Sequence, residues 1–597
     1  MRDLTEAKRY ADNFWGAQED VLAAAVCLAK EANGPINIYG ASVTSYGTFK
    51  ANNSGSTPSN INIKTNTGMN ITSNLTATGS IILNNTVSGT ITTAGAIRAG
   101  GNLNITSMGA VNSNATHSVD GTDSLTGDSV TVTGTVLSTG PFSAVATGIN
   151  SDVGLNAGVT VLGAGNSLLA KAKNNAVTSD GAKTFQTNNG PIIFWSDSDS
   201  SSAGTTYLGA TVSVNTANGA AMSNTANTGG AFIMGGGAPD VADSTKPGGY
   251  SFFNWAANYR GGVTVGNSAT IYTNGGDITL RGKTTNSSGW NGGVWLGYND
   301  TFNSGAGKIS ITGENTGANN FAHGVELNWG SDSYGSNFVS SGGNANTPAI
   351  SITGTANYTN AIGVDNAWYS NSQDATAFQA LGAGGISITG RNNISNSSYY
   401  AVELTGANLV SKTGPIKIDG GARGVRLGNT WDGRNQPLVI GDCFTQPSVN
   451  FPAPLLCDTS NGTVNRTAVD VTIIGDRIQA NSAAVNLNTK GNVSLLPAAS
   501  TNMFAEDITW YGTNSALSPA SLTIGKDTGS TAMTNGVYLP YAQSIAGPIT
   551  LYGRYLTLGG TLTTTGTNSP INLKTTTGMG VTGALVATGK VTLNNTT

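Results

Sequence analysis

The stretch that decides the fold reads Ile309-Ser310-Ile311-Thr312-Gly313, and the same five residues return at 350–354 and 386–390. Looser copies stand at 278–282 and 416–420. Alternation of apolar and polar residues with a period of two is the pattern of a β-strand that is buried on one face. We therefore expect the isoleucines to point inward and the serine outward, and we expect Gly313 to turn the chain.

A second apolar phrase follows each copy and carries one valine: Val294, Val325, Val364, Val402 or Val425. The first phrases begin at residues 278, 309, 350, 386 and 416, which is far closer than the roughly 100 residues of an immunoglobulin-like repeat. No helical pattern separates them, as a βαβ array would require. One coil of short strands per repeat, stacked on the next at about 4.8 Å, explains the spacing. The sequence therefore predicts an all-β protein, a β-solenoid.

The composition suits narrow β structure and excludes several classes of function. Charged residues make up only 10% of the 597 residues, 82 are glycine, and 38% are hydrophobic, which is enough apolar material for a core. The formal net charge is −4 and no basic cluster occurs, which argues against a nucleic-acid partner. No run approaches the roughly 18 apolar residues of a membrane helix, so we expect no transmembrane segment.

Three regions are expected along the chain. Residues 1–33 are rich in charge, have apolar residues at helical spacing and end at Gly34-Pro35, which predicts a helical N-terminal segment that caps the solenoid. Residues 34–544 form the β-helix unit. Because 61–69 return as 571–579 at an offset of 510, residues 545–597 begin a second copy, and we expect the chain to be a piece of a larger repetitive protein.

The cysteines suggest one crosslink and no metal site. Cys443 and Cys457 flank a proline-rich loop insertion near 441–460, and a disulfide closing that loop is expected if the chain is exported; the alternative is two free thiols. Cys27, His117 and His323 are too far apart in the sequence to form a metal-ligand motif. We therefore expect neither a metal nor a cofactor.

The phrases Gly-Pro-Ile-x-Ile/Leu-Tyr-Gly at 34–40 and 547–553 and Ile-Ser-Ile-Thr-Gly, with Asn, Thr and Gly between them, resemble the shaft of the filamentous haemagglutinin family of bacterial exoproteins. The resemblance covers residues 34–597. It implies a right-handed parallel β-helix that is exported across a Gram-negative outer membrane, often through a dedicated partner pore (two-partner secretion). It also implies a secreted or cell-surface adhesin that contacts a host or neighbouring-cell surface or its glycans, with roles in attachment and biofilm.

One row of residues could carry chemistry. The residue after each valine is Trp295, Glu326, Asp365, Glu403 or Arg426, and we expect this row to face outward. If the coils stack in register, the three acids lie about 5 Å apart, a separation that a retaining glycosidase uses. The plainer interpretation is a solvated strand face with ordinary charges, since a fold does not fix a function. A polysaccharide-binding or polysaccharide-cleaving enzyme is therefore the alternative function.

A second row contains aromatic residues. Tyr298, Trp329 and Trp368 each stand four residues after a valine, and a ladder of their rings could stack on sugars. Packing inside a corner of the coil is the plainer interpretation, because such rings bury a large area. No phosphate loop, nucleophile elbow or catalytic Cys/His set is present. The expected function is a non-enzymatic adhesin shaft.

Overall fold

The computed structural model describes residues 23–25 and 30–596, apart from 54, 219–227, 254–259, 286–290, 318–321, 328–334, 367–375, 395–398, 429–437, 443–467, 481–484, 499–501, 511–518 and 530. The described chain consists of β-strands and one short 3-10 helix, η1 (Gly421–Arg423). It divides into two compact units, residues 1–140 and 141–597. Nearly all strand pairs are parallel and in register, as in a β-solenoid. The prediction of an all-β solenoid is confirmed at this level.

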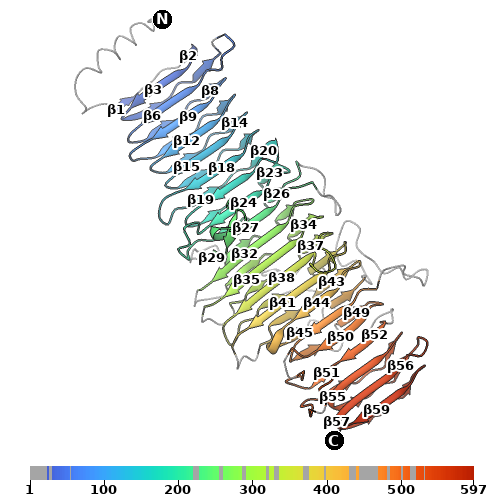
Figure 1. The fold of residues 1–597 in the computed structure, drawn as a ribbon. Coiled ribbons are helices and arrows are strands. Elements are labelled where there is room, and N and C mark those ends of the chain that lie inside the picture. The colour runs from blue at the N-terminus through green and yellow to red at the C-terminus, as the bar shows by residue number, and fades with distance from the viewer. Residues whose placement is uncertain are drawn as a thin grey trace, which may run out of the picture. The chain divides into compact units, whose positions relative to one another are not determined.

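The first unit has three rows of strands, and each coil contributes one strand to each row (Figure 1). The first row is β3 (Ile36–Gly40), β6 (Ile61–Thr65), β9 (Ile81–Asn85), β12 (Leu103–Ser107) and β15 (Asp123–Gly127). The second row is β1 (Ala23–Ala25), β4 (Ser42–Ser45), β7 (Met69–Ile71), β10 (Ile91–Thr93), β13 (Val111–Ser113) and β16 (Val130–Val132). The third row is β2 (Lys30–Asn33), β5 (Phe49–Asn52), β8 (Leu75–Ala77), β11 (Ile97–Ala99), β14 (His117–Val119) and β17 (Val136–Ser138).

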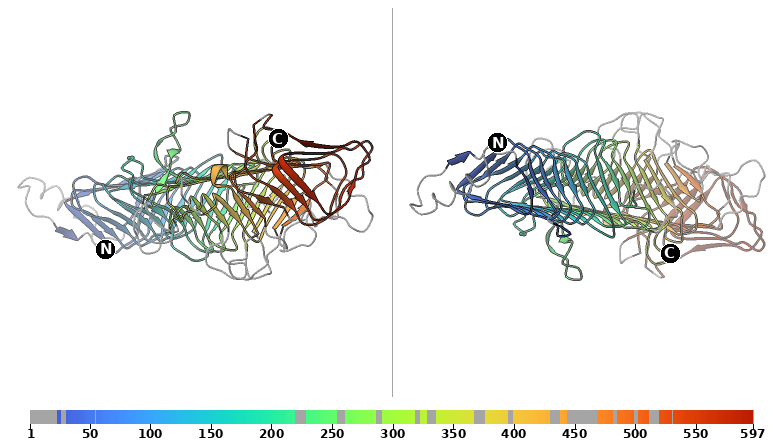
Figure 2. Two further views of the ribbon diagram at one scale, coloured as in Figure 1. Left: turned by 90° about the horizontal axis from the view of Figure 1, so that it is seen from below. Right: turned by 90° about the horizontal axis from the view of Figure 1, so that it is seen from above.

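The second unit repeats the three-row plan with coils of unequal length, and its strands follow one another as rungs in both views of Figure 2. Its first row is β18 (Phe142–Ala146), β21 (Leu168–Lys171), β24 (Ile192–Ser196), β27 (Phe232–Pro239), β32 (Ile278–Thr284), β35 (Ile309–Asn315), β38 (Ile350–Ala356), β41 (Ile386–Asn392), β44 (Ile416–Asp419), β47 (Val471–Ile474), β50 (Asn492–Leu496), β52 (Ser521–Ile524), β55 (Ile549–Leu558), β57 (Ile571–Val581) and β59 (Val591–Asn595). Beside β27 lie the short strands β28 (Pro247–Gly249), which is antiparallel to it, and β29 (Ser251–Phe252).

The second row of this unit is β19 (Val153–Leu155), β22 (Ala176–Val177), β25 (Thr206–Leu208), β30 (Gly261–Val265), β33 (Gly292–Leu296), β36 (Val325–Glu326), β39 (Val364–Asn366), β42 (Val402–Leu404), β45 (Val425–Leu427), β48 (Ile478–Ala480), β51 (Ile508–Thr509) and β53 (Val537–Leu539). The third row is β20 (Val159–Ala164), β23 (Thr184–Asn188), β26 (Ser213–Asn215), β31 (Thr270–Tyr272), β34 (Thr301–Gly305), β37 (Asn337–Ser340), β40 (Thr376–Ala380), β43 (Ala407–Ser411), β46 (Leu438–Gly441) and β49 (Val485–Asn488). A separate group contains β54 (Gln543–Ile545), β56 (Leu562–Thr564) and β58 (Leu585–Val586).

The isoleucine phrases stack as the sequence predicts. Ile309 pairs with Ile350, Ile350 with Ile386, and Ile386 with Ile416, and all four are buried. Their outward neighbours are only partly buried, as the alternating burial of β35, β38 and β41 shows. Identical apolar side chains therefore form continuous inner rows, and burial of this apolar surface is the main force that holds the coils together.

The glycine of the phrase has a different role from the one expected. Gly313 does not turn the chain, because β35 continues to Asn315. A Cβ atom built on Gly313 would lie only 1.9 Å from the carbonyl oxygen of Gly324, which belongs to the segment that leads into β36. Glycine is required here because two backbone segments of one coil approach closely.

Core aromatic residues also follow the stacking. The rings of Phe302, Phe338 and Phe378 occupy equivalent places on β34, β37 and β40. Their centroids are 4.8 Å apart in both steps, with interplanar angles of 4° and 12°. This spacing equals the distance between neighbouring strands, so the backbone ladder fixes the ring stack.

The expected N-terminal helix is not found in the residues that the structure describes. Residues 1–22 and 26–29 lie outside the described residues, and the described parts of 1–33 are the strands β1 and β2, not helix. Both strands pair with the coil that follows them. The apolar residues at helical spacing lie among residues 1–22, outside the described residues, so a helix there stays a prediction. The boundary expected at residue 545 stays a prediction. In the part of the chain that the structure describes, no helix has the length and apolar character needed to cross a bilayer.

Candidate functional site

The row of charged residues on the second strand row is in register but buried. Trp295 pairs with Glu326, Glu326 with Asp365, Asp365 with Glu403, and Glu403 with Arg426. The exposed fractions of the three acids are 2%, 1% and 3%. The expectation that this row faces solvent is therefore wrong. Both faces of β33, β36, β39 and β42 are covered, and alternation in the sequence cannot show such a covering layer.

Glu326 is the most isolated of the three acids. Neither oxygen of its carboxyl group has a hydrogen-bond partner within the described residues. Burial raises the pKa of Glu326 well above its usual range, the neighbouring charge of Asp365 raises it further, and Arg260 opposes both effects. Burial therefore favours the neutral, protonated form of Glu326.

His323 contacts the middle acid. Its Nε2 atom lies 3.2 Å from Oδ2 of Asp365, and its Nδ1 atom accepts a hydrogen bond from the backbone N–H of Ile362 at 3.0 Å. Burial lowers the pKa of His323 to about 4, although the backbone hydrogen bond opposes this. The imidazole is therefore neutral at physiological pH with its proton on Nε2, and its contact with Asp365 is not an ion pair.

Glu403 meets a cation at the other end of the row. Nη1 of Arg426 donates to Oε2 of Glu403 at 3.3 Å. Burial raises the pKa of Glu403 to about 8, against the lowering effect of Arg426 and with a further increase from Asp365. The guanidinium carbons of Arg426 and Arg477 lie 4.9 and 4.5 Å from the ring centroid of Tyr400, so the ring stabilises both cations.

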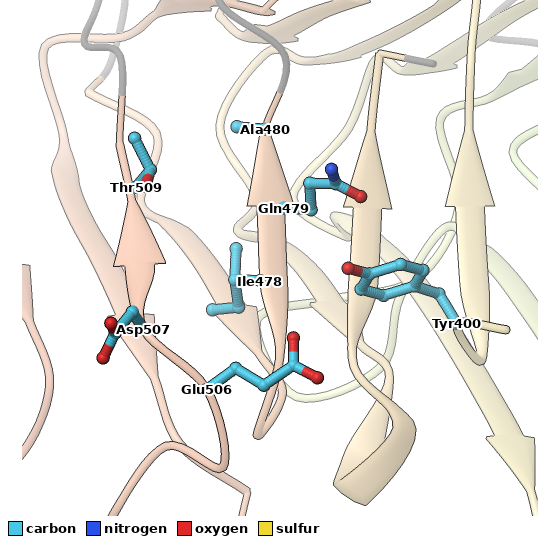
Figure 3. A pocket seen from close by; sticks show the side chains of 7 residues that line it. All are labelled: Tyr400, Ile478, Gln479, Ala480, Glu506, Asp507 and Thr509. Carbon is cyan, nitrogen blue, oxygen red and sulfur yellow. The ribbon is translucent and has the colours of Figure 1, made fainter. Parts of the chain in front are cut away.

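Beyond Arg426 the same row reaches solvent. Arg426 pairs with Gln479, which is exposed, and Gln479 pairs with Thr509. Here the surface has a depression of about 270 Å³ (Figure 3), lined by Tyr400, Ile478, Gln479, Ala480, Glu506, Asp507 and Thr509. Figure 3 shows Tyr400 on one side of β48 and Asp507 with Thr509 on the other. The sequence did not point to this site because β48 and β51 lack the valine phrase that marks the other coils.

The two acids of the depression have partners. Nε of Arg477 lies 2.8 Å from Oε1 of Glu506. Asp507 accepts hydrogen bonds from the hydroxyl of Tyr555 at 2.5 Å and from the backbone N–H of Gly536 at 2.7 Å. These contacts hold both carboxylates in fixed positions at the rim, and the charge of Arg477 offsets that of Glu506.

A serine, a histidine and an aspartate form a buried relay in the first unit. Oγ of Ser113 lies 2.6 Å from Nε2 of His117, and Nδ1 of His117 lies 2.8 Å from Oδ2 of Asp123. Hydrolases use the same order of contacts to activate a serine. All three side chains are at most 1% exposed, so a substrate cannot reach the hydroxyl. We interpret the relay as a buried hydrogen-bond network that links β13, β14 and β15 of one coil and stabilises it.

This relay was missed in the sequence, although a signal was present. Ser113, His117 and Asp123 each occupy an inward position of an alternating strand, where neighbouring coils carry apolar or small residues. Polar residues at such positions need hydrogen-bond partners, and the nearest candidates were one another.

Several predicted site residues cannot be placed. Trp329, Trp368, Cys443 and Cys457 lie outside the described residues, as does nearly all of the loop insertion near 441–460, so the aromatic ladder and the disulfide stay predictions. Tyr298 is half-buried, and its backbone N–H donates to the side chain of Asn267. Among the residues that the structure describes, no group of three or more His, Cys, Asp or Glu is arranged to hold a metal ion. Comparison with protein-family models, curated proteins and solved structures found no match to the chain.

Proposed function

We propose that the chain is a structural shaft of a secreted or surface-exposed bacterial adhesin, wound as a right-handed β-helix and acting in attachment or biofilm formation. The observation that supports this most directly is the unbroken register of the isoleucine phrases, in which seven successive residue pairs join β32 to β35, β35 to β38 and β38 to β41. A stack of this kind is continuous and stiff, and the outward residues of β35, β38 and β41 are polar.

The outer face of the first row fits an exposed shaft. Ser310, Ser351 and Ser387 repeat at the same outward position, and Lys417 follows them on the next coil. Small polar residues keep such a surface soluble without creating the large apolar patches that promote aggregation. Attachment then depends on side loops and local surface features, while the stacked coils hold these features in place.

The enzyme alternative loses its main support. The acids Glu326, Asp365 and Glu403 were its proposed catalytic groups, and all three are buried. A polysaccharide cannot reach carboxyl groups that are at most 3% exposed, and acid–base catalysis requires contact with the glycosidic oxygen. Polysaccharide binding elsewhere on the surface is still compatible with the shaft.

The proposal is tested by deleting the gene and restoring it. We expect the deletion strain to attach less well to host cells or glycan-coated surfaces and the full chain to restore attachment. Unchanged attachment and biofilm in the deletion strain would overturn the adhesin assignment. A triple variant, Glu326→Gln with Asp365→Asn and Glu403→Gln, separates the alternative: glycan turnover by the parent chain that disappears in this variant would favour the enzyme.

A further inference from the structure

The depression on β48 and β51 offers hydrogen-bonding groups that the protein itself does not use. Within the described residues, the side chains of Gln479 and Thr509 and the hydroxyl of Tyr400 make no hydrogen bond to the protein. All three line the depression. Together they present an amide, an aliphatic hydroxyl and a phenol, which can each donate and accept. A ligand with several hydroxyl groups would satisfy all of them.

The charge balance favours a neutral ligand over a cation. Glu506 lies beside Arg477 at 2.8 Å, and Asp507 already accepts hydrogen bonds from Tyr555 and a backbone N–H. A second cation, Arg426, stands behind Tyr400 at 4.9 Å from its ring. Because the acids are compensated, no excess negative charge calls for a metal ion. Their remaining lone pairs can accept hydrogen bonds from a polyol.

The size of the depression favours a ligand that is no larger than one ring. Its volume of about 270 Å³ lies just below the range of about 300–1,000 Å³ that is usual for small-molecule sites. This space fits one ring and excludes a buried stretch of polymer. The ring of Tyr400 is itself only 7% exposed and packs against both arginines, so the phenol contributes its hydroxyl and not a stacking face.

We propose that Gln479, Thr509, Tyr400, Glu506 and Asp507 form a subsite for one neutral sugar residue of a surface glycan. The sugar hydroxyls donate to the carboxylates of Glu506 and Asp507 and exchange hydrogen bonds with the amide of Gln479 and the hydroxyls of Thr509 and Tyr400. The site stands on its own geometry, whereas its use in attachment rests on the proposed function. Affinity for a single residue is on the order of 1–10 mM, so strong attachment requires many copies of the chain on a surface.

The test uses the full chain and four methyl glycosides, those of glucose, galactose, mannose and N-acetylglucosamine, in saturation-transfer NMR. We expect transfer to at least one glycoside, with a Kd in the millimolar range. The double variant Gln479→Ala with Thr509→Val should weaken this binding at least tenfold. The matched control is Thr472→Val, which changes an outward, half-buried residue on β47 outside the depression and should leave binding unchanged. Circular dichroism confirms that each variant is folded.

Three results would overturn the sugar subsite. The first is no transfer to any of the four glycosides, and the second is transfer that persists unchanged in the double variant. The third is calorimetric binding of calcium chloride that disappears in Glu506→Gln, which would identify a cation site. Attachment assays keep this inference apart from the proposed function. Attachment without sugar transfer removes only the subsite, and sugar transfer without attachment removes only the adhesin role.

Discussion

Replacing Glu403 with glutamine should make the chain increasingly more resistant to unfolding than the parent as the pH rises. Glu403 is 3% exposed, and burial raises its pKa to about 8 even though Arg426 stands 3.3 Å away. Glutamine has nearly the same shape, and its amide oxygen can accept the same hydrogen bond from Arg426. It cannot ionise, so the variant removes the cost of a buried charge and little else.

The direction and size of this pH-dependent change in the free energy of unfolding follow from proton binding to Glu403. Between pH 4.5 and about 8 the folded chain keeps a proton on Glu403 that the unfolded chain releases, so stability falls across this window as the pH rises. At about 1.4 kcal/mol for each pH unit, the full difference is about 5 kcal/mol, of which about 4 kcal/mol develops between pH 5 and pH 8.5. The Glu403→Gln variant should not show this loss of stability, and its free energy of unfolding should be close to that of the parent near pH 5.

The measurement is the free energy of local opening at β42, from amide hydrogen exchange corrected for intrinsic rates, because solenoid coils open locally. Glu314→Gln is the control, since Glu314 is partly exposed and its contact with Lys283 at 3.1 Å contributes less than about 1 kcal/mol. If Glu403 were instead charged and stabilised by Arg426, the variant would lose stability relative to the parent as the pH rises. That opposite slope would refute the reasoning.

Three further changes test the packing and the relay. Phe338→Ala removes the middle ring of the phenyl stack and should lower the free energy of unfolding by about 3–5 kcal/mol in denaturant titration, with Phe338→Leu costing less. Gly354→Ala places a Cβ atom 1.8 Å from the carbonyl oxygen of Gly363 and should abolish the cooperative melt, whereas Gly580→Ala, which meets nothing within 4 Å, should melt like the parent. A fluorophosphonate probe should not label Ser113 in the folded chain; labelling would show that the relay is reachable.

The first strand row could be predicted from the sequence because the apolar–polar alternation that specifies it lies within five residues and recurs on successive coils. Ile309, Ile350 and Ile386 each begin a strand of period two, and identical residues on successive coils can only stack in register if the inner row is to stay apolar. The stacking of the valines in the second strand row could be predicted for the same reason. The role of Gly313 did not, because the approach of Gly324 depends on the path of the chain between two strands.

The candidate sites could be derived only in part, for two reasons. Alternation distinguishes the two faces of a strand but says nothing of what covers the outer face, so Glu326 was assigned to solvent, where acids usually lie. The depression brings Tyr400 beside Gln479 and Thr509, which belong to coils of other lengths, and the sequence contains no repeated phrase that sets their register. The relay of Ser113 was within reach, since its members lie at inward positions of neighbouring strands.

Stacking in register explains why the buried acids affect one another. Each coil contributes one acid, yet strand pairing sets Glu326, Asp365 and Glu403 about 4.8 Å apart, where like charges repel strongly in a dry environment. The row can stay buried because burial favours the protonated form of Glu326, His323 is neutral, and a cation lies near each end, Arg260 beside Trp295 and Arg426 beside Glu403. The charge of one coil therefore depends on the coils above and below it. Replacing Asp365 with asparagine should therefore lower the pKa values of both Glu326 and Glu403, because the charge of Asp365 raises them.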